Sequence, residues 1–401
     1  MQLFRWKVFS QAPHRMFFWA GMLYGTLAMA LWGVWLFTGD VSWAFRPGAV
    51  HGIMMLFGFF PMGFLGFLLT VFPRWYMTHE VPRQQYIALW LCHTLGAFAF
   101  ALGAVVYAPL ALASMGLLLA SLGIALVIFL GVLRRTHITP RHHGMYIVLA
   151  FGAGMSALAV CSWGLYAGAY PMFGVGRILG LYGFLTLVVL VVAQRMVPFF
   201  TQGAVPGYEP RRSPYFLPLA ALLLAGHVLL EILGSLAVGY ADLALAALLL
   251  WELMRWRIWR IRRPALVVVL YLALGWVDLA FALSAAGNLY AVWHGLASSP
   301  LGLGPLHALV VGGFGTLLLG MATRVTLGHS GKGIQAAGTR EAALFYGFQS
   351  VPLLRVLPEV LAPWWPEALP WLNWAAVGWF LCFGLWWLWF GDLLTQPRVD
   401  E

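Results

Sequence analysis

Apolar stretches long enough to cross a bilayer follow one another along the whole chain. Hydrophobic residues make up 62% of the 401 residues and charged residues only 9%, whereas soluble domains carry about 25% charged residues. In lipid the backbone must satisfy its own hydrogen bonds, and a helix does so within one segment. We therefore predict an all-α integral membrane protein with a single polytopic membrane domain over residues 1–401 and no separate soluble domain.

Runs of about 20 apolar residues, the length that spans a bilayer, can be placed twelve times along the sequence. The predicted transmembrane helices cover residues 17–37, 49–72, 86–106, 109–133, 144–166, 174–199, 214–236, 239–259, 265–292, 303–327, 341–362 and 371–395.

The basic residues indicate the orientation of these spans. With the amino terminus inside, all but three of the 23 lysines and arginines lie in inner segments, and the exceptions are Arg46, Arg177 and Arg355. Basic residues stay on the cytoplasmic side during insertion, so both termini are predicted to be inside. The net charge of +10 therefore reflects membrane topology, and we expect membrane lipid rather than nucleic acid as the partner of this charge.

Two histidines lie at the outer ends of two glycine-rich spans. His51 begins the second span and His307 begins the tenth, at matching depths within the error of the boundaries. Histidine is rare within membrane spans because its polar ring needs a partner, so such a residue is a functional candidate. The two rings predict a metal or a haem held between these helices, while the alternative for each is an ordinary interfacial histidine.

The outer-side arginines fit this hypothesis. Arg46 precedes His51 by five residues, and Arg177 lies near the outer end of the sixth span. Haem carries two propionates, which a guanidinium can pair with through two hydrogen bonds. We therefore predict Arg46 and Arg177 as residues near the propionates.

The second, sixth and tenth spans indicate an internal repeat. All three are rich in glycine, run from outside to inside, lie four spans apart and end at an arginine, namely Arg74, Arg195 and Arg324. In the sixth span Gly176 and Gly180 form a face that lets a neighbouring helix approach closely. A weak threefold repeat is the expected arrangement.

Other polar residues lie within or beside the spans. His227 and Glu231 are four residues apart on one face of the seventh span, and Asp278 lies near the middle of the ninth. They predict either mutually satisfied hydrogen bonds, a proton path or, for His227, a copper ligand. His93 is expected to be hydrogen-bonded inside the bundle, and His14 to lie at the membrane interface.

Several blocks of the sequence resemble the NnrS family. They are His51-Gly-Ile-Met-Met-Leu-Phe-Gly-Phe59, Gly66-Phe-Leu-Leu-Thr-Val-Phe-Pro-Arg-Trp75, Arg195-Met-Val-Pro-Phe-Phe-Thr201, His307-Ala-Leu309 and Thr323-Arg-Val-Thr-Leu-Gly-His-Ser-Gly331.

The resemblance implies a bacterial inner-membrane protein that contains haem and copper and acts in nitric oxide metabolism or protection from nitrosative stress. The family is similar in layout to the haem-copper oxidase catalytic subunit, with twelve helices in a pseudo-threefold arrangement. There, histidines of the second and tenth helices ligate a haem, which implies that His51 and His307 ligate haem b here. The paired histidines of the oxidase copper site are absent from the seventh span, which carries a single His227.

These observations favour a haem-binding protein that acts on nitric oxide or another small nitrogen oxide, with an oxidoreductase activity and an unidentified electron donor as open expectations. His227 is the best candidate for a second metal site, with Met54, Met55 or Met321 as softer ligands that suit Cu(I). The alternative is a proton-coupled transporter of a small solute that uses Glu231, Asp278 and His227. A purely structural subunit would leave the matched depth of His51 and His307 unexplained.

Overall fold

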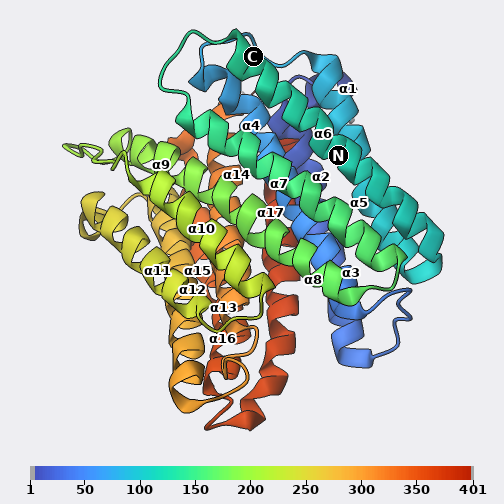
Figure 1. The fold of residues 1–401 in the computed structure, drawn as a ribbon. Coiled ribbons are helices and arrows are strands. Elements are labelled where there is room, and N and C mark those ends of the chain that lie inside the picture. The colour runs from blue at the N-terminus through green and yellow to red at the C-terminus, as the bar shows by residue number, and fades with distance from the viewer. Residues whose placement is uncertain (1–4, 399–401) are drawn as a thin grey trace. The chain divides into compact units, whose positions relative to one another are not determined.

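The computed structural model describes residues 5–398, and the described residues contain helices and no strand (Figure 1). This confirms the all-α fold class. The described chain separates into two compact units, one of residues 5–188, 322–336 and 383–398 and the other of residues 189–321 and 337–382. The prediction of a single membrane domain stays a prediction.

Nine helical stretches among the described residues are long and apolar enough to cross a membrane. They are Pro13–Thr38 (α2), Pro47–Trp75 (α3, η1 and α4), Arg83–Val106 (α5), Ala108–Arg135 (α6), His142–Tyr166 (α7), Tyr170–Gln202 (α8, η2 and α9), Ala265–His294 (α12), Gly304–His329 (α13, η4 and α14) and Pro366–Thr395 (η6 and α17).

The three remaining predicted spans are also helical, but none of them is among the nine long apolar stretches. Helix α10 (Phe216–Ile232) has 17 residues, and α11 (Val238–Arg255) has 18 residues. The predicted eleventh span is divided at Gln349 into α15 (Thr339–Phe348) and α16 (Ser350–Leu361). The count of twelve spans and the orientation of the termini therefore stay predictions.

Three of the nine stretches contain a π-helical segment between two α-helices. These segments are η1 (Met54–Phe59), which follows α3 (Pro47–Ile53), η2 (Leu179–Thr186), which follows α8 (Tyr170–Ile178), and η4 (Ala308–Gly315), which follows α13 (Gly304–His307).

The sequence predicts that these three stretches are repeats of one another. All three contain a π-helical segment between two α-helices. A proline offers a reason for the first: Pro61 lies in the first turn of α4 (Phe60–Trp75) and cannot donate a hydrogen bond to the carbonyl four residues earlier. Such wide turns are rare and are frequently found at functional sites.

Glycine sets the distances between helices in the first unit. A side chain at Gly176 would lie 2.7 Å from the Ala157 carbonyl oxygen and 2.8 Å from the Cys161 backbone nitrogen, both in α7. A side chain at Gly180 would lie 2.7 Å from the ring of Phe57 in η1. The close approach predicted for the Gly176 and Gly180 face is confirmed. Helices α5, α6 and α7 run side by side in this unit (Figure 1).

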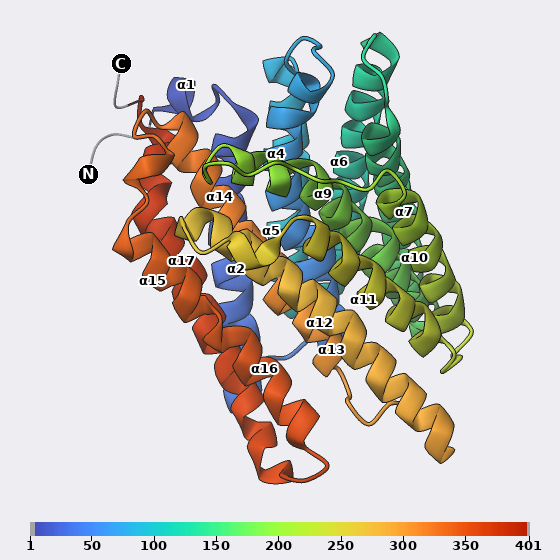
Figure 2. The same ribbon diagram turned by 90° about the vertical axis from the view of Figure 1, so that its left-hand side faces the viewer.

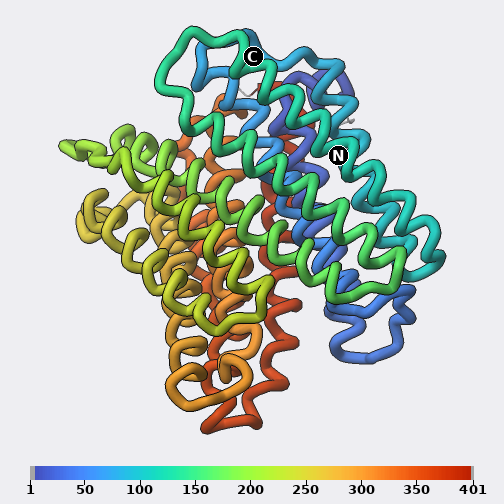
Figure 3. Tube along the Cα trace, viewed as in Figure 1, coloured from blue at the N-terminus to red at the C-terminus, as the bar shows by residue number. Residues whose placement is uncertain are grey.

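In the second unit α10, α11 and α12 lie next to one another in chain order (Figures 2 and 3). A side chain at Gly239 in α11 would lie 3.0 Å from both Asn288 Cβ and Leu289 Cγ in α12. Glycine therefore allows these two helices to approach closely at this level. Asp242 of α11 and Ser284 of α12 lie within hydrogen-bonding distance of each other near this contact.

Short helices complete the described chain. They are α1 (Trp6–Phe9), η3 (Ile258–Arg260), η5 (Ile334–Ala336) and η6 (Pro366–Asn373), and the bounds of the other helical segments are α9 (Leu187–Gln202), α14 (Thr316–His329) and α17 (Trp374–Thr395).

Candidate functional site

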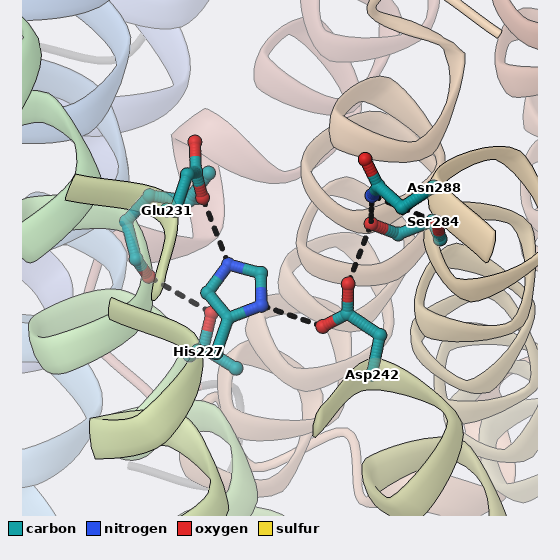
Figure 4. Close-up of polar contacts among 7 residues, drawn as sticks. His227, Glu231, Asp242, Ser284 and Asn288 are labelled. Carbon is teal, nitrogen blue, oxygen red and sulfur yellow. Dashed lines mark hydrogen bonds and ion pairs between the residues drawn. The ribbon is translucent and has the colours of Figure 1, made fainter. Parts of the chain in front are cut away.

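A buried imidazole joins two carboxylates in the second unit (Figure 4). His227 Nδ1 lies 2.5 Å from Asp242 Oδ1, and His227 Nε2 lies 2.8 Å from Glu231 Oε2. The side chains of His227 and Asp242 are 2% and 0% exposed, whereas Glu231 is 27% exposed. The mutual hydrogen bond that the sequence predicts between His227 and Glu231 is confirmed.

The network continues beyond Asp242 into α12. Ser284 Oγ donates to Asp242 Oδ2 at 2.7 Å, and Asn288 Nδ2 donates to the Ser284 carbonyl oxygen at 2.9 Å. Figure 4 shows these residues as a chain of polar contacts that runs from Glu231 through the imidazole to Asn288. Three helices thus contribute to a site that is polar within an apolar unit.

Helix periodicity and one glycine place these groups together. His227 and Glu231 are four residues apart in α10, as are Ser284 and Asn288 in α12, so each pair shares one helix face. Asp242 stands one turn after Gly239, where α11 and α12 approach closely. We call His227, Glu231, Asp242, Ser284 and Asn288 the His227 network.

The hydrogen bonds of the His227 network determine how many protons its imidazole and two carboxylates share. Each of the two contacts between a ring nitrogen of His227 and a carboxylate oxygen needs one proton. Two protons shared by one imidazole and two carboxylates leave one net negative charge, wherever each proton resides. The imidazole can pass a proton from one side to the other because its two nitrogens exchange donor and acceptor roles. Of the two carboxylates bound to the imidazole, Glu231 is the partly exposed one.

A copper ion at His227 would have to displace one of these bonds, because both ring nitrogens face carboxylate oxygens. Within residues 5–398, no group of three or more His, Cys, Asp and Glu side chains is arranged to hold a metal ion. Both ring nitrogens of His227 are thus satisfied by hydrogen bonds, and the proton path and copper ligation at this residue both stay predictions.

Asp278, which the sequence groups with His227 and Glu231, has a different environment. Its Oδ1 is buried and has no hydrogen-bond partner. The neighbouring Trp276 Nε1 donates to Gln349 Oε1 at 2.8 Å rather than to Asp278. The acidic residue that completes the network is instead Asp242, which the sequence analysis did not select. Its signal was present in the sequence, since it is a carboxylate followed by an apolar run inside a predicted span.

His51 lies in α3 of the first unit, three residues before η1. Its ring stacks on Trp32, with centroids 4.4 Å apart and planes 20° from parallel. The guanidinium of Arg46 lies 3.9 Å above the Tyr170 ring, and its backbone nitrogen donates to the Tyr170 hydroxyl at 3.2 Å. These contacts hold α3 and the residue before it against α2 and the start of α8.

His307 is the last residue of α13 and directly precedes η4 in the second unit. Its Nδ1 lies 3.0 Å from the Leu303 carbonyl oxygen and donates a proton to it. In the neutral ring, Nε2 then carries the lone pair that a metal requires. Arg177 is half-buried in α8 of the first unit. The ligation of one iron by His51 and His307 and the pairing of Arg46 and Arg177 with propionates stay predictions.

His93 is hydrogen-bonded inside the bundle, as the sequence predicts. His93 Nε2 donates to the Gly58 carbonyl oxygen at 3.0 Å, and Nδ1 lies 2.8 Å from Ser121 Oγ. Both ring nitrogens are thus satisfied within the first unit. The three cysteines, Cys92, Cys161 and Cys382, are unpaired with one another.

Comparison with known proteins gives one family. A family model described as NnrS protein matches residues 8–398, nearly the whole chain. No curated protein matches the sequence.

Proposed function

This chain belongs to the NnrS family, and from that premise we propose that it binds haem b in the bacterial inner membrane and acts in the response to nitric oxide. Membership of this family fits such a role. The proposed axial ligands are His51 and His307, and Arg46 and Arg177 are the proposed partners of the propionates. When bound, haem supplies an iron that takes nitric oxide as a ligand and exchanges single electrons.

One observation carries the proposal: each of the two histidines lies near the end of a short α-helix, directly before a π-helical segment begins. η1 begins three residues after His51, and η4 begins directly after His307. Stacking on Trp32 fixes the ring plane of His51, and the Leu303 carbonyl fixes the tautomer of His307. Such outer-shell contacts orient histidine ligands in metal sites, so the donor chemistry of each residue fits iron.

Copper is the second proposed cofactor. Met54 and Met55 are buried in η1 beside His51, and Met321 is buried in α14. Thioether sulfur is a soft ligand that suits Cu(I). The electron donor and the product of any redox reaction are left to experiment.

The test of haem binding is an optical spectrum with metal analysis of protein expressed with ample haem. We expect a Soret band in the wild type that is lost, or changed in position and intensity, in His51→Ala and in His307→Ala. The matched control is His294→Ala, because His294 also lies at the end of a long helix with Nδ1 2.9 Å from the carbonyl four residues earlier. An unchanged spectrum in both ligand variants, or a wild type without haem, would refute the proposal.

A second candidate function is proton transfer coupled to the transport of a small solute, and the His227 network favours it. A buried imidazole between two carboxylates, one of them partly exposed, is an arrangement through which protons can move. Transport chemistry and haem binding involve different residues, so separate variants distinguish them.

Proton movement can be followed in proteoliposomes with an internal pH indicator and an imposed membrane potential. We expect His227→Gln and Asp242→Asn to abolish proton flux and Asp278→Asn to preserve it, since Asp278 Oδ1 takes no part in the network. Flux that depends on Asp278 and tolerates the loss of His227 would contradict this assignment.

A further inference from the structure

A groove of about 360 Å³ runs along one face of α12 in the second unit. The walls that α12 contributes recur at the spacing of three and four residues that lines one side of a helix. They are Val268, Tyr271, Leu272, Gly275, Trp276 and Leu279. The groove is therefore long and narrow, and it follows the helix axis.

The length of this groove matches one leaflet of a bilayer. Val268 and Leu279 are eleven positions apart in α12, which at 1.5 Å per residue is roughly 16 Å along the axis. The hydrocarbon core of a bilayer is about 30 Å thick, so one leaflet supplies about half of that. Helix α12 is itself long and apolar enough to cross a membrane. One acyl chain of a single leaflet thus has room to lie along the groove.

The polar side-chain atoms of these walls already have partners within the second unit. The Tyr271 hydroxyl oxygen lies 3.0 Å from Thr201 Oγ1, and Trp276 Nε1 donates to Gln349 Oε1 at 2.8 Å. The other walls from α12 are aliphatic side chains and Gly275. An occupant therefore gains by burying hydrocarbon in the groove, and not by forming hydrogen bonds to its walls.

Arginines flank the two walls that precede α12. These walls are Ile258 and Ile261, and Arg257, Arg260 and Arg262 are their immediate neighbours in the chain. Adjacent Cα atoms are 3.8 Å apart, so the covalent chain itself places the arginines at the end of the groove where α12 begins. Arg260 and Arg262 are exposed, and within residues 5–398 neither side chain forms an ion pair or a hydrogen bond.

The acidic residue that precedes this segment is engaged elsewhere. The Glu252 side chain is 0% exposed, and its Oε1 accepts hydrogen bonds from the Ser213 backbone nitrogen at 3.0 Å and from Trp256 Nε1 at 3.1 Å. Residues 256–263 contain four arginines and no carboxylate. The segment at the end of the groove is therefore cationic, while the groove itself is apolar.

We propose that this groove binds one anionic phospholipid, with an acyl chain along α12 and the phosphate beside Arg260 and Arg262. Guanidinium groups pair with phosphate oxygens through two hydrogen bonds. Basic clusters next to a transmembrane helix attract the anionic lipids of the cytoplasmic leaflet, and the sequence predicts that this end of α12 is cytoplasmic. An apolar groove that ends in arginines matches both parts of such a lipid.

Binding is measured on the intact protein by native mass spectrometry, in titrations with dioleoyl phosphatidylglycerol and dioleoyl phosphatidylcholine. The two lipids carry the same acyl chains, but only phosphatidylglycerol has a net negative charge. We expect phosphatidylglycerol to bind at least about fivefold more tightly, the factor that one arginine near a membrane surface contributes. Dihexanoyl phosphatidylglycerol should compete only weakly with the dioleoyl lipid, because its short chains fill little of the groove.

Arg260→Gln combined with Arg262→Gln tests the headgroup site. The affinity for phosphatidylglycerol should fall by about fivefold for each arginine removed, whereas the affinity for phosphatidylcholine should stay the same. The matched control is Arg134→Gln combined with Arg135→Gln, because these two arginines are also exposed and end α6 in the first unit. The control should keep the wild-type preference for phosphatidylglycerol.

Gly275→Leu tests the acyl-chain groove. A side chain at Gly275 meets no atom within 4 Å, so leucine fills the groove without displacing its walls. The tight complex with phosphatidylglycerol should be lost. Gly116→Leu is the matched control, because Gly116 is likewise exposed in a long helix, α6, with no atom within 4 Å of an added side chain. It should bind lipid like the wild type.

Thermal unfolding shows whether each variant is folded, and the comparisons among lipids on the wild type need no variant. Equal binding of the two dioleoyl lipids, or a folded Arg260→Gln/Arg262→Gln protein with the wild-type preference, overturns the proposal. So does strong competition by the short-chain lipid, or a dimer that Gly275→Leu abolishes while lipid binding persists, since a second copy would then occupy the groove. Haem content, measured in the same samples, bears on His51 and His307 and not on this groove.

Discussion

Asp242 Oδ1 lies 2.5 Å from His227 Nδ1, and both side chains are almost fully buried between helices of the second unit. The contact joins α10, which carries His227, to α11, which carries Asp242. A buried charged or polar group without a partner destabilises the folded protein. Loss of either Asp242 or His227 would leave the other without this partner.

Asp242→Asn should therefore destabilise the protein. Removing one partner of a buried ionic pair typically costs about 3–5 kcal/mol, and we expect a loss in that range in the free energy of unfolding, measured by denaturant titration in detergent. Glu231→Gln should cost less, since Glu231 is 27% exposed and water can replace part of its contact.

Asp40→Asn serves as the control for this substitution, because Asp40 is exposed in the segment after α2. It should leave the unfolding curve unchanged. Equal stability of Asp242→Asn and the wild type would show that the buried contact contributes nothing.

Gly176→Ala tests the close packing of α8 against α7. The new methyl group would lie 2.7 Å from the Ala157 carbonyl oxygen, which cannot move without shifting the helix. Overpacking of this kind costs about 1–3 kcal/mol, and the thermal midpoint should fall. Gly174→Ala is the control, because a methyl group there meets no atom within 4 Å, and a fall of the same size in both variants would contradict the packing argument.

His93→Leu tests the role of this histidine in supporting η1. Leucine has a similar size but cannot donate to the Gly58 carbonyl oxygen, which His93 Nε2 contacts at 3.0 Å. An unsatisfied buried carbonyl costs about 1–3 kcal/mol, so unfolding should occur at lower denaturant concentration. His137→Leu, in an exposed position, should behave like the wild type, and a stable His93→Leu protein would exclude this role.

Gln349→Leu tests the break between α15 and α16. Gln349 accepts a hydrogen bond from Trp276 Nε1 at 2.8 Å and donates to the Phe345 carbonyl oxygen at 2.9 Å. Loss of the acceptor leaves the indole N–H without its partner, at a cost of about 1–3 kcal/mol. The emission of the tryptophans should change, and Ser350→Ala, at an exposed neighbour, should leave both stability and emission unaltered.

The structure also shows where sequence reasoning about the polar residues was limited. The sequence identified His227 and Glu231 because residues four apart in one helix share a face, and the 2.8 Å contact between them confirms it. It did not select Asp242, whose partners His227 and Ser284 lie in other helices. Helical periodicity gives no information about which helix lies opposite.

Length and hydrophobicity determined where most of the long helices lie, although the predicted eleventh span is divided at Gln349. Predicted spans such as 86–106 and 265–292 correspond to Arg83–Val106 and Ala265–His294, because a helix satisfies its backbone hydrogen bonds within its own segment and so depends on local sequence. The tertiary structure alone decided that His227 meets Asp242 and that His14 meets His329. Those contacts depend on how helices pack, which is set by side-chain shape and by glycines at positions of close approach.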